Sequence, residues 1–99
     1  MTKHEKLAEE YFLSGYNCAQ AVFLAFAEEQ GISREAAARI ASSFGGGVGG
    51  MREMCGALSG LCMAAGLLYG YDSPKAYEEK AEHYARIRVL ADGFCAQFG

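Results

Sequence analysis

A chain of 99 residues has room for one domain with one modest hydrophobic core. Hydrophobic residues make up 52% of the chain and charged residues 21%, which excludes an extended disordered protein. The net charge of −3, with nine basic residues scattered among twelve acidic ones, argues against nucleic acid as a partner, because phosphates are neutralised by clustered lysine and arginine.

The N-terminal segment, MTKHEKLAEE, is charged from its third residue and lacks the apolar stretch of a signal peptide. We therefore expect a cytoplasmic protein. Four cysteines in a cytoplasmic chain of this size are more than packing requires, and structural disulfides are uncommon in that compartment.

Three amphipathic helices are predicted in the first half of the chain. The first covers residues 3–13, the second starts after the N-cap Asn17 and ends at Gly31, and the third starts after the N-cap Ser33. The residues expected to face inward are Leu7, Ala8, Tyr11 and Phe12 in the first helix, Cys18, Ala21, Val22, Ala25 and Phe26 in the second, and Ala37, Ile40, Ala41 and Phe44 in the third.

A glycine run, GGGVGG at residues 45–50, follows the third helix. Glycine costs about 1 kcal/mol per residue in a helix interior, so this run is predicted to be a loop. A fourth helix starts within residues 52–55 and ends at Tyr69 or Gly70. Residues 54–71 carry no charge over about the length of a membrane span, but their glycines and alanines and the amphipathic helices around them favour the buried central helix of a bundle and no membrane segment.

A long fifth helix is predicted to begin at Ser73-Pro74, an N-cap followed by proline at the first helical position. Its inward-facing residues are expected to be Tyr77, Ala81, Tyr84, Ile87, Ala91, Phe94, Cys95 and Phe98. No strand-period alternation is present. The sequence therefore predicts an all-α, single-domain bundle of about five helices over residues 1–99, with a glycine-rich loop before the buried fourth helix.

Two cysteines are expected at helix starts, Cys18 in the first turn of the second helix and Cys55 in the first turn of the fourth. Unpaired N–H groups and the helix dipole at such ends stabilise a thiolate over a thiol, which makes both residues candidate nucleophiles or metal ligands. Arg52 would favour the thiolate of Cys55 further, unless it only points to solvent. The alternative for Cys18 and Cys55 is ordinary packing, since buried free cysteine is common.

The other two cysteines have packing as their simplest explanation. Cys62 follows Cys55 by two helical turns, about 10 to 11 Å of rise, which is too far for a disulfide between them. Cys95 lies near the end of the last helix. No C-x-x-C is present, so a thioredoxin-type site and a zinc knuckle are excluded, and any site must be assembled from separate helices.

Glycines surround Cys55 on both sides, and they suggest either close packing or a binding role. Gly56 and Gly60 are spaced i, i+4, as are Gly66 and Gly70, and such pairs let two helix backbones approach closely. The alternative is that a cofactor or the second cysteine comes close to the Cys55 backbone. The run lacks the lysine of a P-loop, but its N–H groups could cradle an anion or a sulfur. The candidate cofactor-binding residues are Gly46, Gly47, Gly49, Gly50 and Gly56.

The two histidines, His4 and His83, do not form a ligand cluster in the sequence. His83 lies between Glu82 and Tyr84 and is expected on the surface of the last helix. A catalytic pair of a cysteine with His83 is the alternative.

Four segments recur in a characteristic order, GYNCAQAV at 15–22, SFGGG at 43–47, GGM at 49–51 and CGALSG at 55–60. Their order resembles a known family, the redox-active proteins named for a C…GCAxxG…C…C cysteine motif. The resemblance implies electron transfer or other redox activity, with Cys18 as the first motif cysteine and Cys55 as the second. Similar domains occur beside cytochromes, where an iron–sulfur centre has been suggested. Family members usually continue past a step like Phe98-Gly99 into a segment with a further cysteine, so this is a short member or the tail is missing.

Three hypotheses follow. The first is a redox or electron-transfer protein, a thiol oxidoreductase or an electron carrier, in which Cys18 and Cys55 cycle between dithiol and disulfide with a redox partner protein. The second is an iron–sulfur or other metal-cluster protein, whose candidate ligands are Cys18, Cys55, Cys62 and Cys95, with a second subunit as another source of ligands. The third is a non-catalytic helical module that assembles with itself, as a homodimer, or with a partner.

Overall fold

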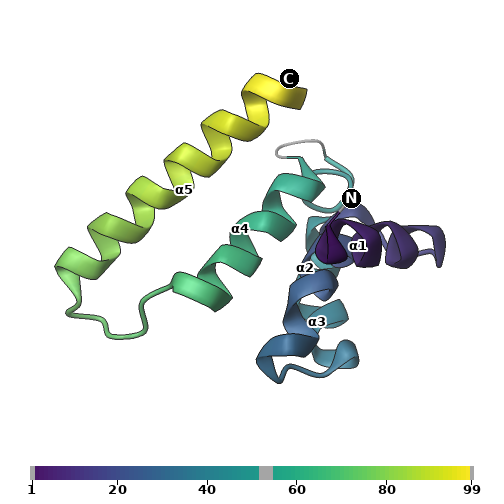
Figure 1. Ribbon diagram of the computed structural model, residues 1–99, viewed down its shortest axis with the longest axis horizontal. Coiled ribbons are helices and arrows are strands. Elements are labelled where there is room, and N and C mark those ends of the chain that lie inside the picture. Colours follow the sequence, from purple (N-terminus) through teal and green to yellow (C-terminus); the bar gives the residue numbers. More distant parts are fainter. Residues whose placement is uncertain (1, 52–54, 99) are drawn as a thin grey trace.

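The computed structural model describes residues 2–51 and 55–98, with the backbone alone at residues 97 and 98. Within these residues the chain forms five α-helices and no strand (Figure 1), which confirms the all-α prediction. The helices are α1 (Lys3–Leu13), α2 (Cys18–Ala27), α3 (Arg34–Ala41), α4 (Gly56–Tyr69) and α5 (Tyr77–Phe98), and two short 3₁₀ turns, η1 (Glu28–Gln30) and η2 (Ser42–Phe44), follow α2 and α3.

Capping side chains determine where the first three helices begin. Thr2, Asn17 and Ser33 each accept a hydrogen bond from the backbone N–H three residues further on. This satisfies one of the N–H groups that a helix start leaves unpaired. Gly31, with φ +83°, ends the segment of α2 and η1 in the left-handed conformation that glycine adopts without strain.

The central helix of the bundle is α2, and the prediction that the fourth helix would be central is wrong. α2 packs against α1, α3 and α4, and its buried residues include Phe23 and Leu24, whereas α4 buries only small residues. α2 has three neighbouring helices, so most of its faces are covered. The core is otherwise built mainly of alanine. Three residues of the first three helices that were predicted to face inward, Phe12, Cys18 and Ile40, are exposed instead.

The long helix α5 differs most from its prediction. It begins at Tyr77, because Ser73 and Pro74 form a turn closed by a hydrogen bond from the Ala76 N–H to the Ser73 carbonyl (3.2 Å). α5 packs on α4 with no comparable contact to the other described α-helices. The predicted inward residues Tyr77 and Tyr84 are therefore 72% and 48% exposed.

His83 is the buried residue of the described part of α5, with 8% of its surface exposed, so the prediction of a surface histidine is wrong. Its ring packs edge-on against Tyr71 at 6.4 Å between centroids. Its Nδ1 accepts a hydrogen bond from Nη1 of Arg86 at 3.1 Å. Arg86 also lies 5.3 Å from the ring centre of Tyr69, so this end of α5 is attached to α4 by polar and aromatic contacts.

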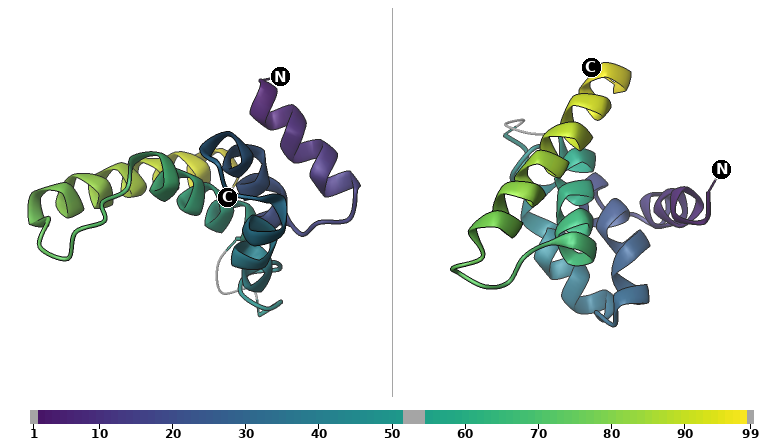
Figure 2. Two further views of the ribbon diagram at one scale, coloured as in Figure 1. Left: turned by 90° about the horizontal axis from the view of Figure 1, so that it is seen from below. Right: turned by 60° about the vertical axis from the view of Figure 1, so that its left-hand side comes forward.

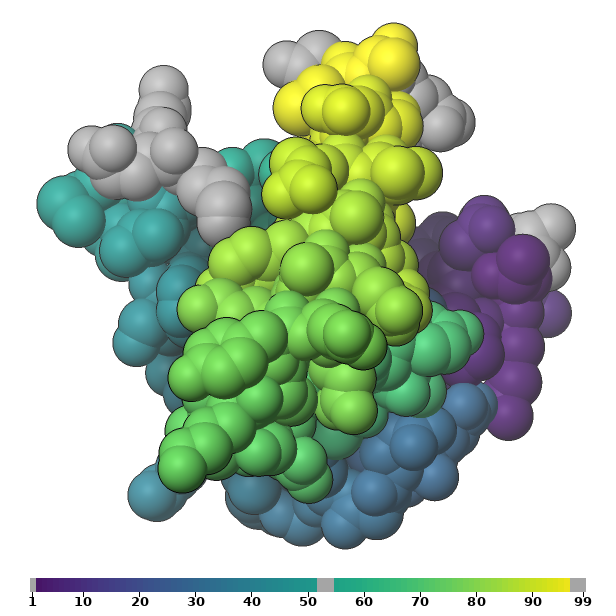
Figure 3. All heavy atoms as spheres, turned by 90° about the vertical axis from the view of Figure 1, so that its left-hand side faces the viewer, coloured from purple at the N-terminus to yellow at the C-terminus, as the bar shows by residue number. Residues whose placement is uncertain are grey.

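The α4–α5 pair and helix α1 lie on different sides of α2. Figure 2 shows α4 and α5 as an antiparallel pair that extends to one side, while α1 lies on the other side of α2. From the side shown in Figure 3, α5 covers the front and its C-terminal turns rise above the rest. No helix in the described residues is long and apolar enough to span a membrane.

Candidate functional site

The start of α2, which carries Cys18 as its first residue, is held by a capping box. The Gln20 N–H donates to the Asn17 side chain at 2.9 Å, and the Asn17 N–H donates to the Gln20 side chain at 3.0 Å. Gln20 Nε2 also donates to the Ala38 carbonyl of α3 at 2.9 Å. The backbone at Cys18 is thus fixed both within α2 and against α3.

Asn17 has a second function that its capping role alone does not indicate. Its Nδ2 donates to the Ser42 carbonyl at 3.3 Å, and a Cβ atom at Gly45 would lie 2.5 Å from the same nitrogen. Only glycine leaves room for this contact. Asn17 therefore holds the beginning of the glycine loop against the helix start that carries Cys18.

The glycine loop forms a left-handed turn, which is a more specific structure than the predicted loop. Residues 46–50 all have φ between 59° and 79°, a backbone region that is unfavourable for residues other than glycine. The Gly49 N–H donates to the Ser43 carbonyl at 2.7 Å, and the Gly50 N–H donates to the Gly45 carbonyl at 3.0 Å. These two N–H groups are engaged within the loop and are not free for the predicted anion or sulfur contact.

The start of α4 packs directly on the start of α2. A Cβ atom at Gly56 would lie 3.2 Å from the Cβ of Cys18 and 3.2 Å from the Phe44 carbonyl, and one at Gly60 would lie 2.7 Å from the Ala19 carbonyl. The prediction that Gly56 and Gly60 allow close backbone approach is confirmed. The corresponding prediction for Gly66 is wrong, because the space around its Cβ position is open.

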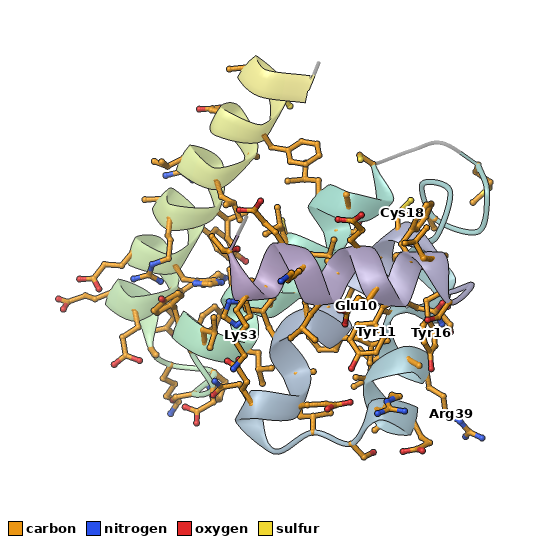
Figure 4. The ribbon with its side chains drawn as sticks, turned by 45° about the vertical axis from the view of Figure 1, so that its right-hand side comes forward. Lys3, Glu10, Tyr11, Tyr16, Cys18 and Arg39 are labelled. Carbon is orange, nitrogen blue, oxygen red and sulfur yellow. The ribbon has the colours of Figure 1, made fainter. Side chains whose placement is uncertain are left out.

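This packing places the start of α4, which follows Cys55 in the chain, against Cys18. Cys55 is one peptide unit, about 3.8 Å between Cα atoms, from Gly56, which itself contacts Cys18. Both cysteines are exposed and both are free thiols. Figure 4 shows Cys18 on the side of the molecule where α4 begins and the loop folds back. Arg52, predicted to act on Cys55, lies outside the described residues.

Cys55 is the N-cap residue of α4 rather than a residue of its first turn. Its side chain makes no capping hydrogen bond, so the first N–H groups of α4 have no side-chain acceptor from this residue. Cys55 thus lies at the N-terminal end of α4, one residue before the predicted first turn.

The remaining cysteines occupy different surroundings. Cys62 is half-buried in α4, and burial raises the pKa of its thiol. Cys95 is exposed near the C-terminal end of α5, which lies at the same end of the molecule as the start of α4 (Figure 1).

An iron–sulfur cluster takes four protein ligands. In residues 2–51 and 55–98, no three His, Cys, Asp or Glu side chains come together as a metal site would require.

Sequence reasoning did not identify Gln20 or the contact of Asn17 with the loop. The Asn-x-x-Gln spacing of a capping box was visible for Gln20. No local signal indicates which carbonyl groups the two amides reach across the bundle, because that depends on where α3 and η2 lie.

These features define an all-α bundle that presents two free cysteines at adjoining helix starts beside a left-handed glycine turn. A family model described as "Putative redox-active protein (C_GCAxxG_C_C)" matches residues 16–99, and the chain belongs to this family. Searches of curated proteins and of solved structures found no match.

Proposed function

We propose that this protein is a thiol redox protein in which Cys18 and Cys55 cycle between dithiol and disulfide. The observation that carries the proposal is the contact of Gly56 with Cys18, because Cys55 is the residue next to Gly56 in the chain. Both cysteines stand at helix starts, and both are exposed free thiols. Membership of a redox-active family supports the same chemistry.

The reaction is a thiol–disulfide exchange with a disulfide substrate. One cysteine, as the thiolate, attacks a substrate sulfur and forms a mixed disulfide, and the first substrate thiolate leaves. The second cysteine, as the thiolate, then attacks the sulfur of the first, and the second substrate thiolate leaves. The two substrate thiolates take up the two protons released by the cysteines, so Cys18 and Cys55 lose two electrons together and the substrate disulfide gains them.

The substrate in this proposal is a disulfide on a redox partner protein. Exposure of Cys18 and Cys55 supports a large partner, because a protein disulfide needs open access to the attacking sulfur. We propose a cytoplasmic location, where partner proteins keep such a pair cycling. Whether the protein acts as an oxidoreductase or as a carrier depends on which partner reoxidises or reduces the pair.

Mass spectrometry of the oxidised protein tests the pairing. After treatment with oxidised glutathione and alkylation of free thiols, we expect a disulfide between the tryptic peptide of Cys18 and that of Cys55. No lysine or arginine separates Cys55 from Cys62, so both lie in one tryptic peptide. The Cys62→Ser variant resolves this ambiguity and should still form the disulfide, whereas Cys55→Ser should not.

The pairing fails if Cys62→Ser abolishes the disulfide, or if oxidation leaves Cys18 and Cys55 unlinked while the protein stays folded. The Cys95→Ser variant is the matched control at an exposed cysteine. It removes one thiol without touching the α2–α4 contact, so its disulfide yield should equal that of the natural protein.

A helical interaction module is a second candidate function, and the exposed aromatic side chains Tyr77 and Tyr84 of α5 favour it. In this case α5 would bind a second copy of the chain or a partner, and the cysteines would be inert. The Cys18→Ser/Cys55→Ser double variant separates the interaction module from the thiol redox protein. Light scattering measures its assembly, and a cellular assay measures its function. If assembly and cellular function are both retained, the module is favoured; if assembly is retained and function is lost, the thiol pair is favoured.

A further inference from the structure

A hollow of about 380 Å³ lies between α4 and α5, apart from the two proposed redox cysteines. It is lined by Cys62 of α4 and by His83, Tyr84, Ile87 and Arg88 of α5. Neither the Cys18–Cys55 chemistry nor the family description assigns a role to these residues. The hollow brings a buried imidazole, a half-buried thiol and a guanidinium to one place, and their chemistry indicates what it would bind.

The hydrogen bond at His83 determines which ring nitrogen carries the proton. Arg86 can only donate, so Nδ1 of His83 is the acceptor in their 3.1 Å contact and the ring proton lies on Nε2. Nε2 has no hydrogen-bond partner among the described residues. Every fully buried side-chain nitrogen or oxygen in the described residues does have such a partner, so Nε2 is not fully buried. Nε2–H is therefore an accessible donor, on a side chain that is more than nine-tenths buried and that lines the hollow.

The other polar groups of the hollow favour the same kind of ligand. Arg88 contributes a guanidinium, whereas the Tyr84 hydroxyl is hydrogen-bonded to that of Tyr71, and no carboxylate of a described residue lines the hollow. Neither Arg86 nor Arg88 forms an ion pair with a described carboxylate. The hollow thus has unpaired positive charge and donor groups in a chain whose net charge is −3.

The remaining wall is apolar. Ile87 contributes a hydrocarbon surface, and burial raises the pKa of the Cys62 thiol, which keeps this side chain uncharged at neutral pH. An uncharged thiol does not repel an anion and behaves as a small apolar group. The hollow therefore combines anion-binding groups with an apolar surface.

We infer that this hollow binds a small carboxylic acid with an apolar body, its carboxylate on His83 Nε2–H and Arg88 and its body against Cys62 and Ile87. A metal ion fits less well, because Nδ1 is occupied by Arg86 and Nε2 carries the proton. The inference does not depend on the Cys18–Cys55 pair.

Protection of Cys62 from alkylation tests the site in the reduced, full-length protein, with benzoate as the probe. Bound benzoate should cover Cys62 and slow its reaction with N-ethylmaleimide at least threefold at saturation, as measured by fragment mass spectra that separate Cys62 from Cys55. The reaction of exposed Cys95 should not change. Benzamide, which has the same shape without the charge, should give no protection at the same concentration.

An arginine variant tests the role of the guanidinium. Arg88→Gln should raise the benzoate concentration for half-protection about tenfold, as expected for loss of a charge-assisted hydrogen bond. Arg39→Gln, at an exposed arginine of α3 that forms no ion pair with a described residue, is the matched control and should change nothing. The inference is overturned if benzoate gives no protection, if benzamide protects equally, if Zn²⁺ protects and benzoate does not, or if the two arginine variants behave alike.

Discussion

The contact between α2 and α4 that joins the two redox cysteines makes a sharp prediction for Gly60. A methyl group there would lie 2.7 Å from the Ala19 carbonyl and 2.9 Å from the Cβ of Val22. Neither neighbour yields easily, since one belongs to the α2 backbone and the other is a β-branched carbon at its attachment point. Gly60→Ala should therefore push the two helices apart.

The size of the effect follows from two opposing contributions. Carbon atoms normally pack at about 3.5 to 4.0 Å, so the helices must separate by roughly 0.5 to 1 Å. Overpacking of this kind costs about 1 to 3 kcal/mol, and the higher helix propensity of alanine offsets about 1 kcal/mol. Gly60→Ala should lower the free energy of unfolding by about 0 to 2 kcal/mol.

Gly66 is the matched control on the same helix, because nothing lies within 4 Å of its Cβ position. Gly66→Ala should gain only the propensity, about 0.5 to 1 kcal/mol. The two variants should differ by about 1 to 3 kcal/mol, and in a domain of this size each kcal/mol shifts Tm by about 4 to 8 °C. Urea unfolding followed by helical circular dichroism measures the difference. If Gly60→Ala proves as stable as Gly66→Ala, the helices do not pack as closely as described.

Three further predictions concern the loop, the α2 cap and Cys62. In urea unfolding, Ser33→Ala should lower the free energy of unfolding by about 1 kcal/mol, the usual cost of losing an N-cap. Asn17→Ala should cost more, because Asn17 caps α2 and also donates to the Ser42 carbonyl before the loop. Equal losses would contradict the second role of Asn17. Val48→Gly should stabilise the protein by up to about 1 kcal/mol and Gly50→Ala should destabilise it by about 1 to 2 kcal/mol in thermal unfolding, since both positions have positive φ; effects of the opposite sign would exclude the left-handed turn. Because burial raises the pKa of Cys62, its contribution to stability should be complete below the unfolded thiol pKa of about 8.5 and should be lost as the pH rises through the higher folded pKa. In the Cys62→Ala variant, the free energy of unfolding should fall less steeply as the pH rises above the unfolded thiol pKa. If it falls as steeply as in the natural protein, other groups cause the decline.

Most helix boundaries were predictable from the sequence because their causes are local. The first helix was predicted over residues 3–13 and forms over those residues. Asn17 and Ser33 were predicted as caps, and both accept the expected hydrogen bonds. The start of α5 was the exception. Ser73 and Pro74 suit a β-turn as well as a helix start, and the turn is what forms.

Inward and exposed faces were less predictable, because a helix face is buried only if another helix covers it. Tyr77 and Tyr84 lie at helical spacing with other apolar residues, but α5 has a single neighbouring α-helix to which it packs closely, and both tyrosines are exposed. The same reason explains His83. Its sequence neighbours are polar, but its position on α5 faces α4 and the Tyr71 ring.

The sequence by itself determined the helices, the break at the glycine run and the position of Cys18 and Cys55 at two helix starts. These features depend on capping, helical period and the conformational freedom of glycine, which act over a few residues. Only the tertiary structure decided that Gly56 meets Cys18 and that α2 is central. It also decided that Cys62 and His83 share a hollow. Such contacts depend on which helix surfaces fit together, and residues far apart in the chain share no local signal of that fit.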